Sequence, residues 1–357
     1  YLDEIKNKIE YFLIESATPS WDHDYKLIKE VKKKHPHLKI IVSGPISTSG
    51  QKWDSNIIYA VLKGEYEKNI MKVLNGKDGV FNHDLLTKEE MNEAPLPYYD
   101  KYIYDKYFDG NPIPMNKLFP QAHIWSSRGC PFKCIFCVWP AAMTGNDPHG
   151  DGKRAVRQYT PEYIDNLVKE LTGRYKFKAI YFDDDTFNIG NRHTEKMSEV
   201  MSKFKIPWFA MCRADTSKKE TWKTMSDSGC QGVKLGVESG SQVVVDKIVN
   251  KHLDLKYVQE VVSYIRSLDM SVHGTFTYGL PGETKNDMIK TKRFIKETNF
   301  STVQESGTAE IEGTPLHALI NEEKLTTYPG AIADENYDRQ KDGGKKWQSL
   351  VKELQNN

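Results

Sequence analysis

Residues 127–137 read SRGCPFKCIFC, and this short stretch decides the interpretation of the whole 357-residue chain. It places Cys130, Cys134 and Cys137 in a C-x3-C-x2-C spacing. The chain has five cysteines, and a disulfide framework would pair them and scatter them along the sequence. A cluster this tight is instead typical of thiolates that bind iron or another metal. Three thiolates can hold three irons of a [4Fe–4S] cube, which leaves the fourth iron open to a substrate or cofactor.

Zinc is the alternative metal for such a cluster. A zinc site needs a fourth nitrogen or sulfur ligand at a recognisable spacing. His149 is the nearest downstream candidate, but it lies at an irregular distance in a glycine-rich stretch. The remaining cysteines, Cys212 and Cys230, are more typical of small buried apolar residues than of ligands. We therefore favour an iron–sulfur cluster.

Around the cysteines, short apolar runs alternate with amphipathic helical patterns, which indicates an α/β fold. The predicted strands are 123–127, 179–183, 208–213, 232–236, 271–278 and 302–307. The predicted helices are 161–174, 194–204, 218–228, 255–268 and 284–298. Such a series over residues 121–316 predicts a partial (β/α)6 TIM-like barrel, whose chemistry would lie at the carboxyl ends of its strands.

The first 75 residues show a second, smaller alternation of strands and helices. Strands are predicted at 9–14, 38–42 and 57–62, with helices at 25–34 and 66–74. This order predicts part of a Rossmann-like domain with a three-stranded parallel sheet, which binds ligands at the strand ends. Residues 76–120 are rich in turn-forming pairs and are predicted to be a linker. Residues 317–357 are predicted to be a polar helical extension with a helix over 344–354.

The charge balance limits the classes of partner. Lys and Arg number 50 against 49 Asp and Glu, giving a net charge of +1. Binding to nucleic acid usually needs a surplus of positive charge, so we expect a small-molecule substrate and no nucleic acid. No apolar run approaches the ~20 residues of a membrane span. The first residues do not read as a signal peptide, and we expect a cytoplasmic protein.

The cysteine motif, on a loop after the first strand of a partial barrel, resembles that of the radical SAM superfamily. Phe136 matches the aromatic residue that usually precedes the third cysteine there. The resemblance implies a [4Fe–4S] cluster held by the three cysteines, with S-adenosylmethionine (SAM) chelated by the free iron. It implies reductive cleavage of SAM to a 5′-deoxyadenosyl radical, with electrons from an external low-potential donor of the flavodoxin or ferredoxin type.

Three further strand ends match positions that bind SAM in that superfamily. The second predicted strand of the barrel ends in an acidic run, and the third ends in an arginine. The fourth ends in a G-V-E-S-G segment that resembles the family's G-x-E-S-G. The alternatives are a solvated Asx-turn for the acidic run and a surface ion pair for the arginine. The predicted SAM contacts are Asp183, Asp184, Asp185, Arg213, Glu238 and Ser239, together with Phe136. The G-L-P-G-E-T segment at 279–284 is interpreted as mainly structural.

The first 75 residues resemble the second half of a cobalamin-binding Rossmann domain. In that family, the loops after these strands hold the corrinoid tail, and small residues allow the backbone to approach it closely. The implied cobalamin contacts are Ser16, Thr18, Gly44, Gly64 and Glu65. The first half of such a domain and the D-x-H-x-x-G motif are not found in this sequence. A flavodoxin-like sheet fragment is the alternative.

Together these features resemble the cobalamin (B12)-dependent radical SAM enzymes. The resemblance implies a methyltransferase that methylates an unactivated carbon, or a phosphinate phosphorus, through methylcobalamin. The alternatives are a cyclisation or rearrangement enzyme without net methyl transfer and a non-catalytic iron–sulfur or corrinoid-binding protein. A methylthiotransferase is disfavoured because no cysteine precedes Cys130. Substrate contacts are not assigned by any motif; the candidates are the 141–157 loop and the barrel ends near Tyr278, Gln304 and Glu310. In that loop, Lys153, Arg154 and Arg157 would suit an anionic substrate, and the alternative is a solvated loop.

Overall fold

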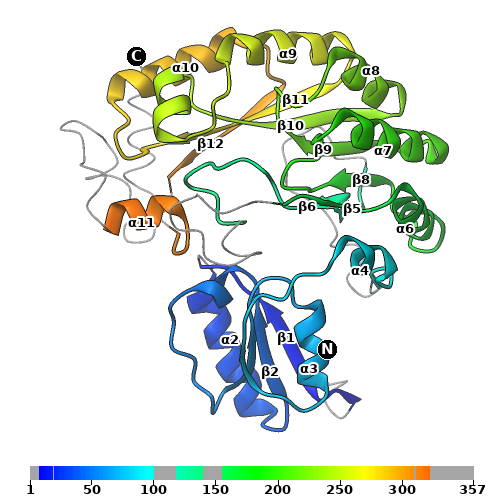
Figure 1. Cartoon of the computed structure of the whole chain (residues 1–357), viewed down its shortest axis with the longest axis vertical. Coiled ribbons are helices and arrows are strands. Elements are labelled where there is room, and N and C mark those ends of the chain that lie inside the picture. Colours follow the sequence, from blue (N-terminus) through cyan, green and yellow to red (C-terminus); the bar gives the residue numbers. More distant parts are fainter. Residues whose placement is uncertain (1–7, 19, 100–117, 140–154, 309–310, 322–357) are drawn as a thin grey trace. The chain divides into compact units, whose positions relative to one another are not determined.

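The computed structural model describes residues 8–18, 20–99, 118–139, 155–308 and 311–321 (Figure 1). The chain forms two compact units, each of which is described by itself. The first is built on residues 1–90 and includes segments 135–154 and 310–324. The second contains residues 91–134 and 155–309 and continues from residue 325. The predicted helix over 344–354 lies outside the described residues.

The first unit holds a four-stranded parallel sheet in the order β1-β2-β3-β4. Its strands are β1 (Tyr11–Glu15), β2 (Lys39–Ser43), β3 (Ile58–Leu62) and β4 (Gly79–Phe81), and its helices include α2 (Trp21–Lys34) and α3 (Glu67–Leu74). Alternate side chains of β2 point to opposite faces: Ile40 and Val42 pack with α2, whereas Ile41 packs with α3. The sheet is therefore covered on both faces, as a doubly wound fold requires.

The prediction of three strands in this sheet was wrong by one. The fourth strand, β4, pairs with β3 and lies beyond residue 75, in the stretch predicted to be a linker. It is only three residues long, begins with Gly79 and follows Gly76 closely, so it has the local appearance of a turn. A short helix, α4 (Lys88–Glu93), follows in the same stretch. Pairing with a neighbouring strand, which no local pattern reveals, makes β4 a strand.

The second unit holds a six-stranded sheet in the order β12-β11-β10-β9-β8-β5, with every neighbouring pair parallel. Its strands are β5 (Gln121–Ile124), β8 (Ala179–Phe182), β9 (Trp208–Cys212), β10 (Cys230–Glu238), β11 (Ser271–Tyr278) and β12 (Thr302–Gly307). The helices are α6 (Pro161–Gly173), α7 (Asn191–Phe204), α8 (Lys219–Asp227), α9 (Leu255–Ser267) and α10 (Lys285–Glu297). These helices cover one face of the sheet, which confirms the predicted partial barrel (Figure 1).

The helices α6 and α10 begin within one residue of their predicted starts. Thr160 accepts a hydrogen bond from the backbone N–H of Tyr163 and precedes Pro161 at the first helical position of α6. Thr284 and Asp287 form a reciprocal capping box at the start of α10. The predicted strand at 123–127 is divided: β5 ends at Ile124, and β6 (Ser127–Arg128) pairs antiparallel with β7 (Arg157–Gln158).

In the described ranges, no helix combines the length and the apolar character that crossing a membrane requires.

Candidate active site

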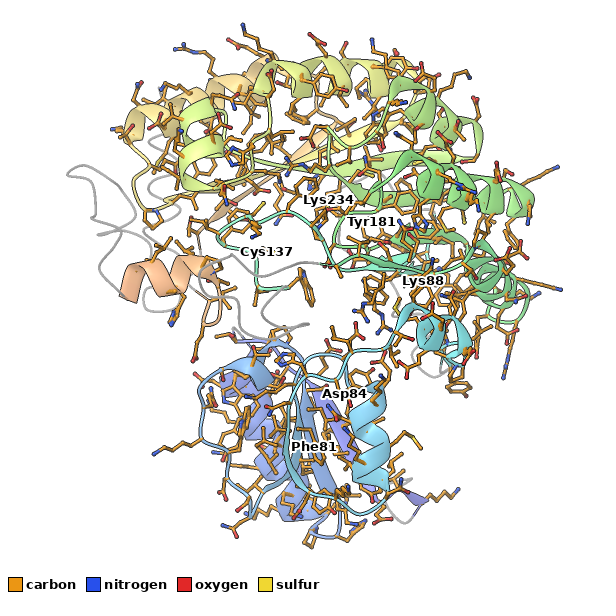
Figure 2. All side chains as sticks on the ribbon, viewed as in Figure 1. Phe81, Asp84, Lys88, Cys137, Tyr181 and Lys234 are labelled. Atoms are coloured by element: carbon orange, nitrogen blue, oxygen red, sulfur yellow. The ribbon has the colours of Figure 1, made fainter. Side chains whose placement is uncertain are left out.

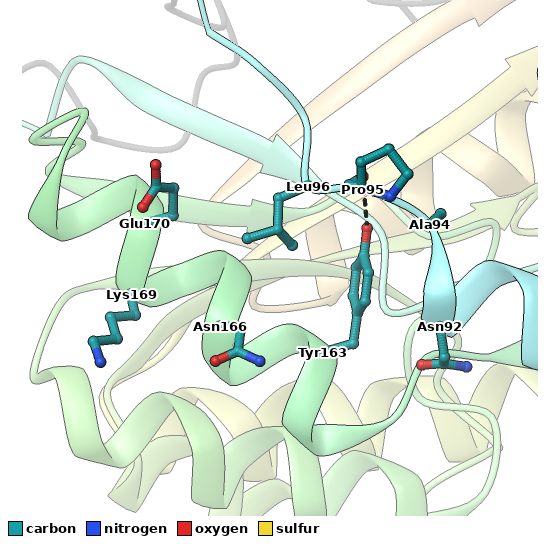
Figure 3. A pocket seen from close by; sticks show the side chains of 8 residues that line it. All are labelled: Asn92, Ala94, Pro95, Leu96, Tyr163, Asn166, Lys169 and Glu170. Carbon is teal, nitrogen blue, oxygen red and sulfur yellow. Dashed lines mark hydrogen bonds between the residues drawn. The ribbon is translucent and has the colours of Figure 1, made fainter.

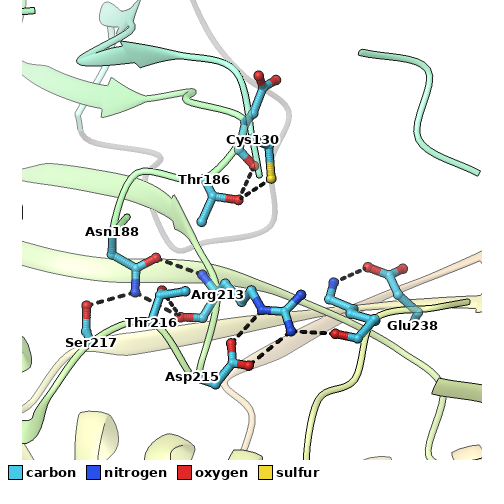
Figure 4. A network of polar contacts seen from close by, with 10 residues as sticks. Cys130, Thr186, Asn188, Arg213, Asp215, Thr216, Ser217 and Glu238 are labelled. Atoms are coloured by element: carbon cyan, nitrogen blue, oxygen red, sulfur yellow. Dashed lines mark hydrogen bonds and ion pairs between the residues drawn. The ribbon is translucent and has the colours of Figure 1, made fainter. Parts of the chain in front are cut away.

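The cysteine loop begins at the carboxyl end of β5 and is anchored by the loop that follows β8. Gly129 has φ +96°, and a Cβ at this position would lie 2.2 Å from the carbonyl oxygen of Ala155, so only glycine fits. The Gly129 N–H donates to Asp185 at 2.9 Å, and the Cys130 sulfur lies 3.5 Å from the Thr186 hydroxyl (Figure 4). Tertiary contacts thus hold the first ligand position.

The three consecutive acids after β8 have different surroundings. Asp184 is completely buried and accepts hydrogen bonds from the Ser126 N–H and hydroxyl and from the Ser127 hydroxyl, at 2.6–3.0 Å. Burial raises the pKa of Asp184 to about 6, and the serine hydrogen bonds oppose that rise. Asp184 is therefore an internal anchor for the start of the cysteine loop.

The two carboxylates on either side of Asp184 have different partners. Asp185 accepts from Gly129, and its burial raises its pKa. Asp183 is half exposed, with its carboxylate 3.6 Å from Nδ1 of His123. The three carboxylates therefore have different partners, and the structure does not bring the acids together as one cation-binding cluster.

Arg213 is buried at the end of β9 and is held on several sides. Its guanidinium donates to both carboxylate oxygens of Asp215, at 2.5 and 3.0 Å, and to the backbone carbonyl of Lys251. The guanidinium carbon lies 3.7 Å from the ring centre of Phe132, on the cysteine loop, in a cation–π contact. Asn188 clamps the backbone of Arg213 through both its N–H and its carbonyl (Figure 4).

One nitrogen of this guanidinium is left over. Nη1 of Arg213 is buried and has no hydrogen-bond partner among the described residues. A buried donor without a partner is unfavourable by about 1–3 kcal/mol, so an acceptor is expected there. Because Arg213 is buried, it does not form a surface ion pair, and its binding of a ligand stays a prediction.

Glu238 ends β10 in a strained conformation, with φ +75°. Its carboxylate accepts from Nζ of Lys251 at 2.9 Å (Figure 4), and from the hydroxyl of Thr277 at 3.2 Å. Each side chain of the Glu238–Lys251 pair is only 10% exposed. Burial alone would lower the pKa of Lys251, but the charges of Glu238 and Cys134 outweigh it and the pKa is raised.

The sequence reasoning missed Lys251 and the turn that carries it. Asn250 and His252, on either side of Lys251, both have positive φ, and the turn follows a short π-helix, Val244–Ile248. The Asn250 side chain donates to the Lys133 carbonyl, next to Cys134, at 3.1 Å. The only local signal in the sequence is that the lysine lies between an asparagine and a histidine, two residue types that adopt positive φ more often than most. This signal is too weak to identify the turn without the fold.

The rest of the G-V-E-S-G segment packs against α10. The Ser239 hydroxyl is completely buried, lies 3.0 Å from the Thr291 hydroxyl, and accepts from the N–H of Ser241. A Cβ on Gly240 would lie 2.7 Å from the Cα of Thr291. Ser239 therefore fastens the end of β10 to α10, and its hydroxyl already has protein partners.

The remaining motif positions lie in a half-buried stretch. Burial raises the pKa of Cys134, while the positive charges of Lys251 and Arg213 act to lower it. Phe136 and Cys137 are half-buried. Considering the described residues alone, no three Cys, His, Asp or Glu side chains are gathered as a metal site. The support for iron binding thus comes from the sequence, namely three thiolates at this spacing, and not from cysteine side chains that already lie together in the structure.

The strand ends of the four-stranded sheet are lined mostly by small residues. Gly44 has φ +85°, and a Cβ there would lie 2.6 Å from the Ser16 carbonyl oxygen. The Ser16 hydroxyl donates to Asp24 at 2.6 Å, and the Ser43 hydroxyl is buried with no partner among the described residues. Gly64 also has positive φ, +72°.

Two other predicted positions in this unit differ in character. Glu65 is buried, and its carboxylate accepts from the Leu86 N–H at 3.1 Å, so it holds the chain that follows β4. Thr18 is half-buried at the end of the β1 loop. Ser16, Gly44 and Gly64 are therefore placed at strand ends as predicted, whereas Glu65 has a structural partner.

A surface groove of about 530 Å³ lies elsewhere in the second unit. It runs between α6 and residues 92–96, where the Tyr163 hydroxyl donates to the Pro95 carbonyl (Figure 3). The groove is lined by Asn92, Ala94, Pro95, Leu96, Tyr163, Asn166, Lys169 and Glu170. None of these residues belongs to the predicted site, and the groove lies on the helical layer.

Residues 126–295 match the sequence profile of the Radical SAM superfamily. This part of the chain is similar to the catalytic domain of that superfamily, whose enzymes use a [4Fe–4S] cluster and SAM. The match includes the three cysteines and the strand ends that carry Asp183, Arg213 and Glu238.

The relatives of known name include methyltransferases. The chain is 25% identical to an uncharacterized methyltransferase of Pyrococcus horikoshii over 87% of this chain and 70% of that protein. It is 26% identical to the cytidylyl-2-hydroxyethylphosphonate methyltransferase of Streptomyces wedmorensis, over 64% of this chain but only 43% of that enzyme. A putative methylthiotransferase of Methanocaldococcus jannaschii is 26% identical over 82% of this chain and 65% of that protein.

Solved structures of the same fold include the radical SAM methyltransferase TsrM from Kitasatospora setae, with tryptophan and a SAM analogue bound. It has a TM-score of 0.73 and 14% identity, and covers 99% of this chain and 79% of TsrM. The cobalamin-dependent radical enzyme OxsB has a TM-score of 0.62 and 14% identity, and covers 91% of this chain and 49% of OxsB. At such identities the likeness shows the fold alone, and it confirms the predicted fold class.

Proposed function

We propose that this protein is a cobalamin-dependent radical SAM methyltransferase that methylates a carbon, or a phosphinate phosphorus, of a small molecule. The observation that carries the proposal is the presence, in one chain, of two parallel sheets with different strand ends. In the six-stranded sheet, the cysteine motif follows the first strand. In the four-stranded sheet, mostly small residues line the strand ends. The methyltransferase names among the relatives support the same activity.

In the radical SAM domain, Cys130, Cys134 and Cys137 would hold the cluster. The bound cluster would supply the electron that cleaves SAM. Arg213 would offer its unpartnered Nη1 to the SAM carboxylate, since a buried guanidinium nitrogen needs an acceptor. The open carboxylate of Asp183 would accept from the SAM amino group. Glu238, held by Lys251 and Thr277, would present a fixed acceptor to the ribose.

In the first unit, Ser16, Ser43, Gly44 and Gly64 would accept the corrinoid tail. The fit rests on two observations. The buried Ser43 hydroxyl lacks a partner among the described residues, and glycines with positive φ leave no side chain between the backbone of the strand ends and a ligand. Bound cobalamin would carry the methyl group between SAM and the substrate. The Glu65 carboxylate would shape this site indirectly, through Leu86.

The test is anaerobic and needs no substrate. The cluster would be reconstituted, and SAM, hydroxocobalamin and a low-potential reductant added, with products identified by mass spectrometry. We expect both 5′-deoxyadenosine and S-adenosylhomocysteine. Both products should vanish in the triple Cys130/Cys134/Cys137→Ala variant and persist in Cys230→Ala, which removes a cysteine outside the motif. A cluster-loaded wild type that gives neither product would overturn the proposal.

The same experiment separates the alternatives. 5′-Deoxyadenosine without S-adenosylhomocysteine would favour cyclisation or rearrangement over methyl transfer. A methylthiotransferase is a second candidate because methylthiotransferases occur among the relatives. It would require sulfur to enter the product, whereas the five cysteines of this sequence include no second trio. The electron donor and the small-molecule substrate are proposed as partners on the same basis.

A further inference from the structure

A lysine lies near the centre of the six-stranded sheet, in the middle of an inner strand. Lys234 belongs to β10, where the fully buried side chains of Val233, Leu235 and Val237 alternate with it. Successive strand residues point to opposite faces, so Lys234 shares a face with Gly232 and Gly236. The buried valines and leucine face the helices, which leaves Lys234 on the face that the helices do not cover (Figure 2).

That uncovered face is also the face of the candidate active site. A Cβ on Gly236 would lie 2.6 Å from Oε1 of Glu238 and 2.8 Å from Nζ of Lys251. Lys234 precedes Gly236 by two residues, so it lies one step of about 7 Å further from the strand ends on the same side. It is therefore placed below the proposed SAM contacts and not among them.

The surroundings of Lys234 are apolar or already paired. In register with it lie Met211 on β9 and His273 on β11, whose ring nitrogen Nδ1 is 2.8 Å from the Thr302 hydroxyl. The next row away from the strand ends holds Tyr181 and Phe209, which pack together with Leu118 and Phe119. This row forms an apolar floor.

Three of the acids near this face have a basic partner among the described residues. Asp183 lies beside His123, Asp215 pairs with Arg213, and Glu238 pairs with Lys251. Lys234 is half-buried, and no residue in the described ranges forms a hydrogen bond or an ion pair with it. Lysine is depleted in strands, so a half-buried lysine at the centre of a sheet is an unusual choice of residue. The position therefore carries one unmatched positive charge.

We propose that Lys234 binds an anionic group of the substrate, a phosphate, phosphonate or carboxylate, whose apolar part packs on Tyr181, Phe209 and Met211. The inference rests on the proposed function, because it takes this face to be the substrate side of a radical SAM site. It assigns the anion contact to a strand lysine, whereas the sequence analysis had named Lys153, Arg154 and Arg157 for an anionic substrate.

The test measures binding without turnover, so its failure is distinguishable from failure of the SAM-cleavage assay. Cluster-loaded protein with SAM, and with no reductant, would be titrated by ligand-observed NMR with phenyl phosphate, phenylphosphonate, benzoate and benzyl alcohol. We expect at least one anion to bind wild type, and Lys234→Met to weaken it about tenfold to a hundredfold, the range for a lost charged hydrogen bond. Benzyl alcohol should bind weakly to both proteins.

Two variants control the experiment. Lys234→Arg keeps the charge and should retain the preference for anions, while Lys196→Met removes an exposed lysine of α7 and should leave binding unchanged. If Lys234→Met does not fold, as judged by thermal melting, Lys234→Gln replaces it. Equal anion binding by wild type and the neutral variant would overturn the proposal. So would wild type that binds benzyl alcohol as tightly as the anions.

Discussion

The carboxyl ends of the two parallel sheets share a topology and differ in chemistry. In the six-stranded sheet, two ion pairs with buried members lie at the strand ends, Arg213–Asp215 and Lys251–Glu238. In the four-stranded sheet, Ser16, Ser43 and Gly44 leave mostly backbone and hydroxyl groups. A parallel sheet always offers its strand ends to a ligand. The side chains there decide whether the ligand is gripped by charge or by close backbone approach.

The largest expected effect comes from Lys251→Met, which leaves the Glu238 carboxylate buried and unpaired. Breaking a buried ion pair in this way typically costs about 3–5 kcal/mol. We expect such a loss in the free energy of unfolding, measured by urea denaturation, and loss of 5′-deoxyadenosine formation. The double variant Glu238→Gln/Lys251→Met should recover much of the stability but not the activity. Equal stability of the single variant and wild type would refute a charge-matched site.

The second effect tests the small-residue end. Gly44 has φ +85° and ψ −176°, a conformation essentially restricted to glycine, and a Cβ would meet the Ser16 carbonyl. Gly44→Ala should destabilise the protein by about 1–3 kcal/mol and reduce cobalamin retained on gel filtration, read from its visible absorbance. Gly173→Ala is the matched control, because a Cβ there has open space. Cobalamin retention equal to wild type would remove Gly44 from the proposed cobalamin site.

The third effect is a pH dependence of stability that comes from a carboxylate near the strand ends of the six-stranded sheet. Glu283, in the loop after β11, is completely buried and accepts from the N–H groups of Gly279 and Leu280. Burial raises its pKa to about 8, against these hydrogen bonds. The folded protein therefore holds this proton when the unfolded chain has lost it, so stability falls as the pH rises between the two pKa values.

From pH 6 to pH 8, this titration should lower the free energy of unfolding by about 2 kcal/mol. Asp184, whose pKa is raised to about 6, acts in the same direction but mainly below this range. Glu283→Gln cannot ionise and should have a flatter profile over pH 6–8. Parallel profiles for wild type and the glutamine variant in thermal melts would show that Glu283 is ionised throughout.

The smallest effect distinguishes neighbouring acids. Asp184→Asn replaces an acceptor of three hydrogen bonds from Ser126 and Ser127 and should cost about 1–2 kcal/mol. Asp183→Asn changes a half-exposed carboxylate and should alter stability by less than about 0.5 kcal/mol. Denaturation midpoints of the two variants, measured side by side, provide the comparison. The reverse order of effects would contradict the assignment of Asp184 as the internal anchor.

Much of the fold could be predicted from local patterns. Short apolar runs located every strand of the six-stranded sheet, and the predicted starts of α6 and α10, at residues 161 and 284, lie within one residue of the observed ones. The fourth strand of the smaller sheet escaped this reasoning, since three residues beside glycines carry too little pattern. Strand β4 exists because β3 offers it hydrogen-bond partners, and that is a tertiary condition.

The sequence by itself determined the class of chemistry. The spacing of Cys130, Cys134 and Cys137 is a local property, and metal ligands close in sequence need no fold to be recognised. The tertiary structure alone decided how the charges are distributed. It separated Asp184 from Asp183, paired Lys251 with Glu238, and left Lys234 without a partner among the described residues. Burial and charge pairing depend on residues far apart in the chain, and only folding brings these together.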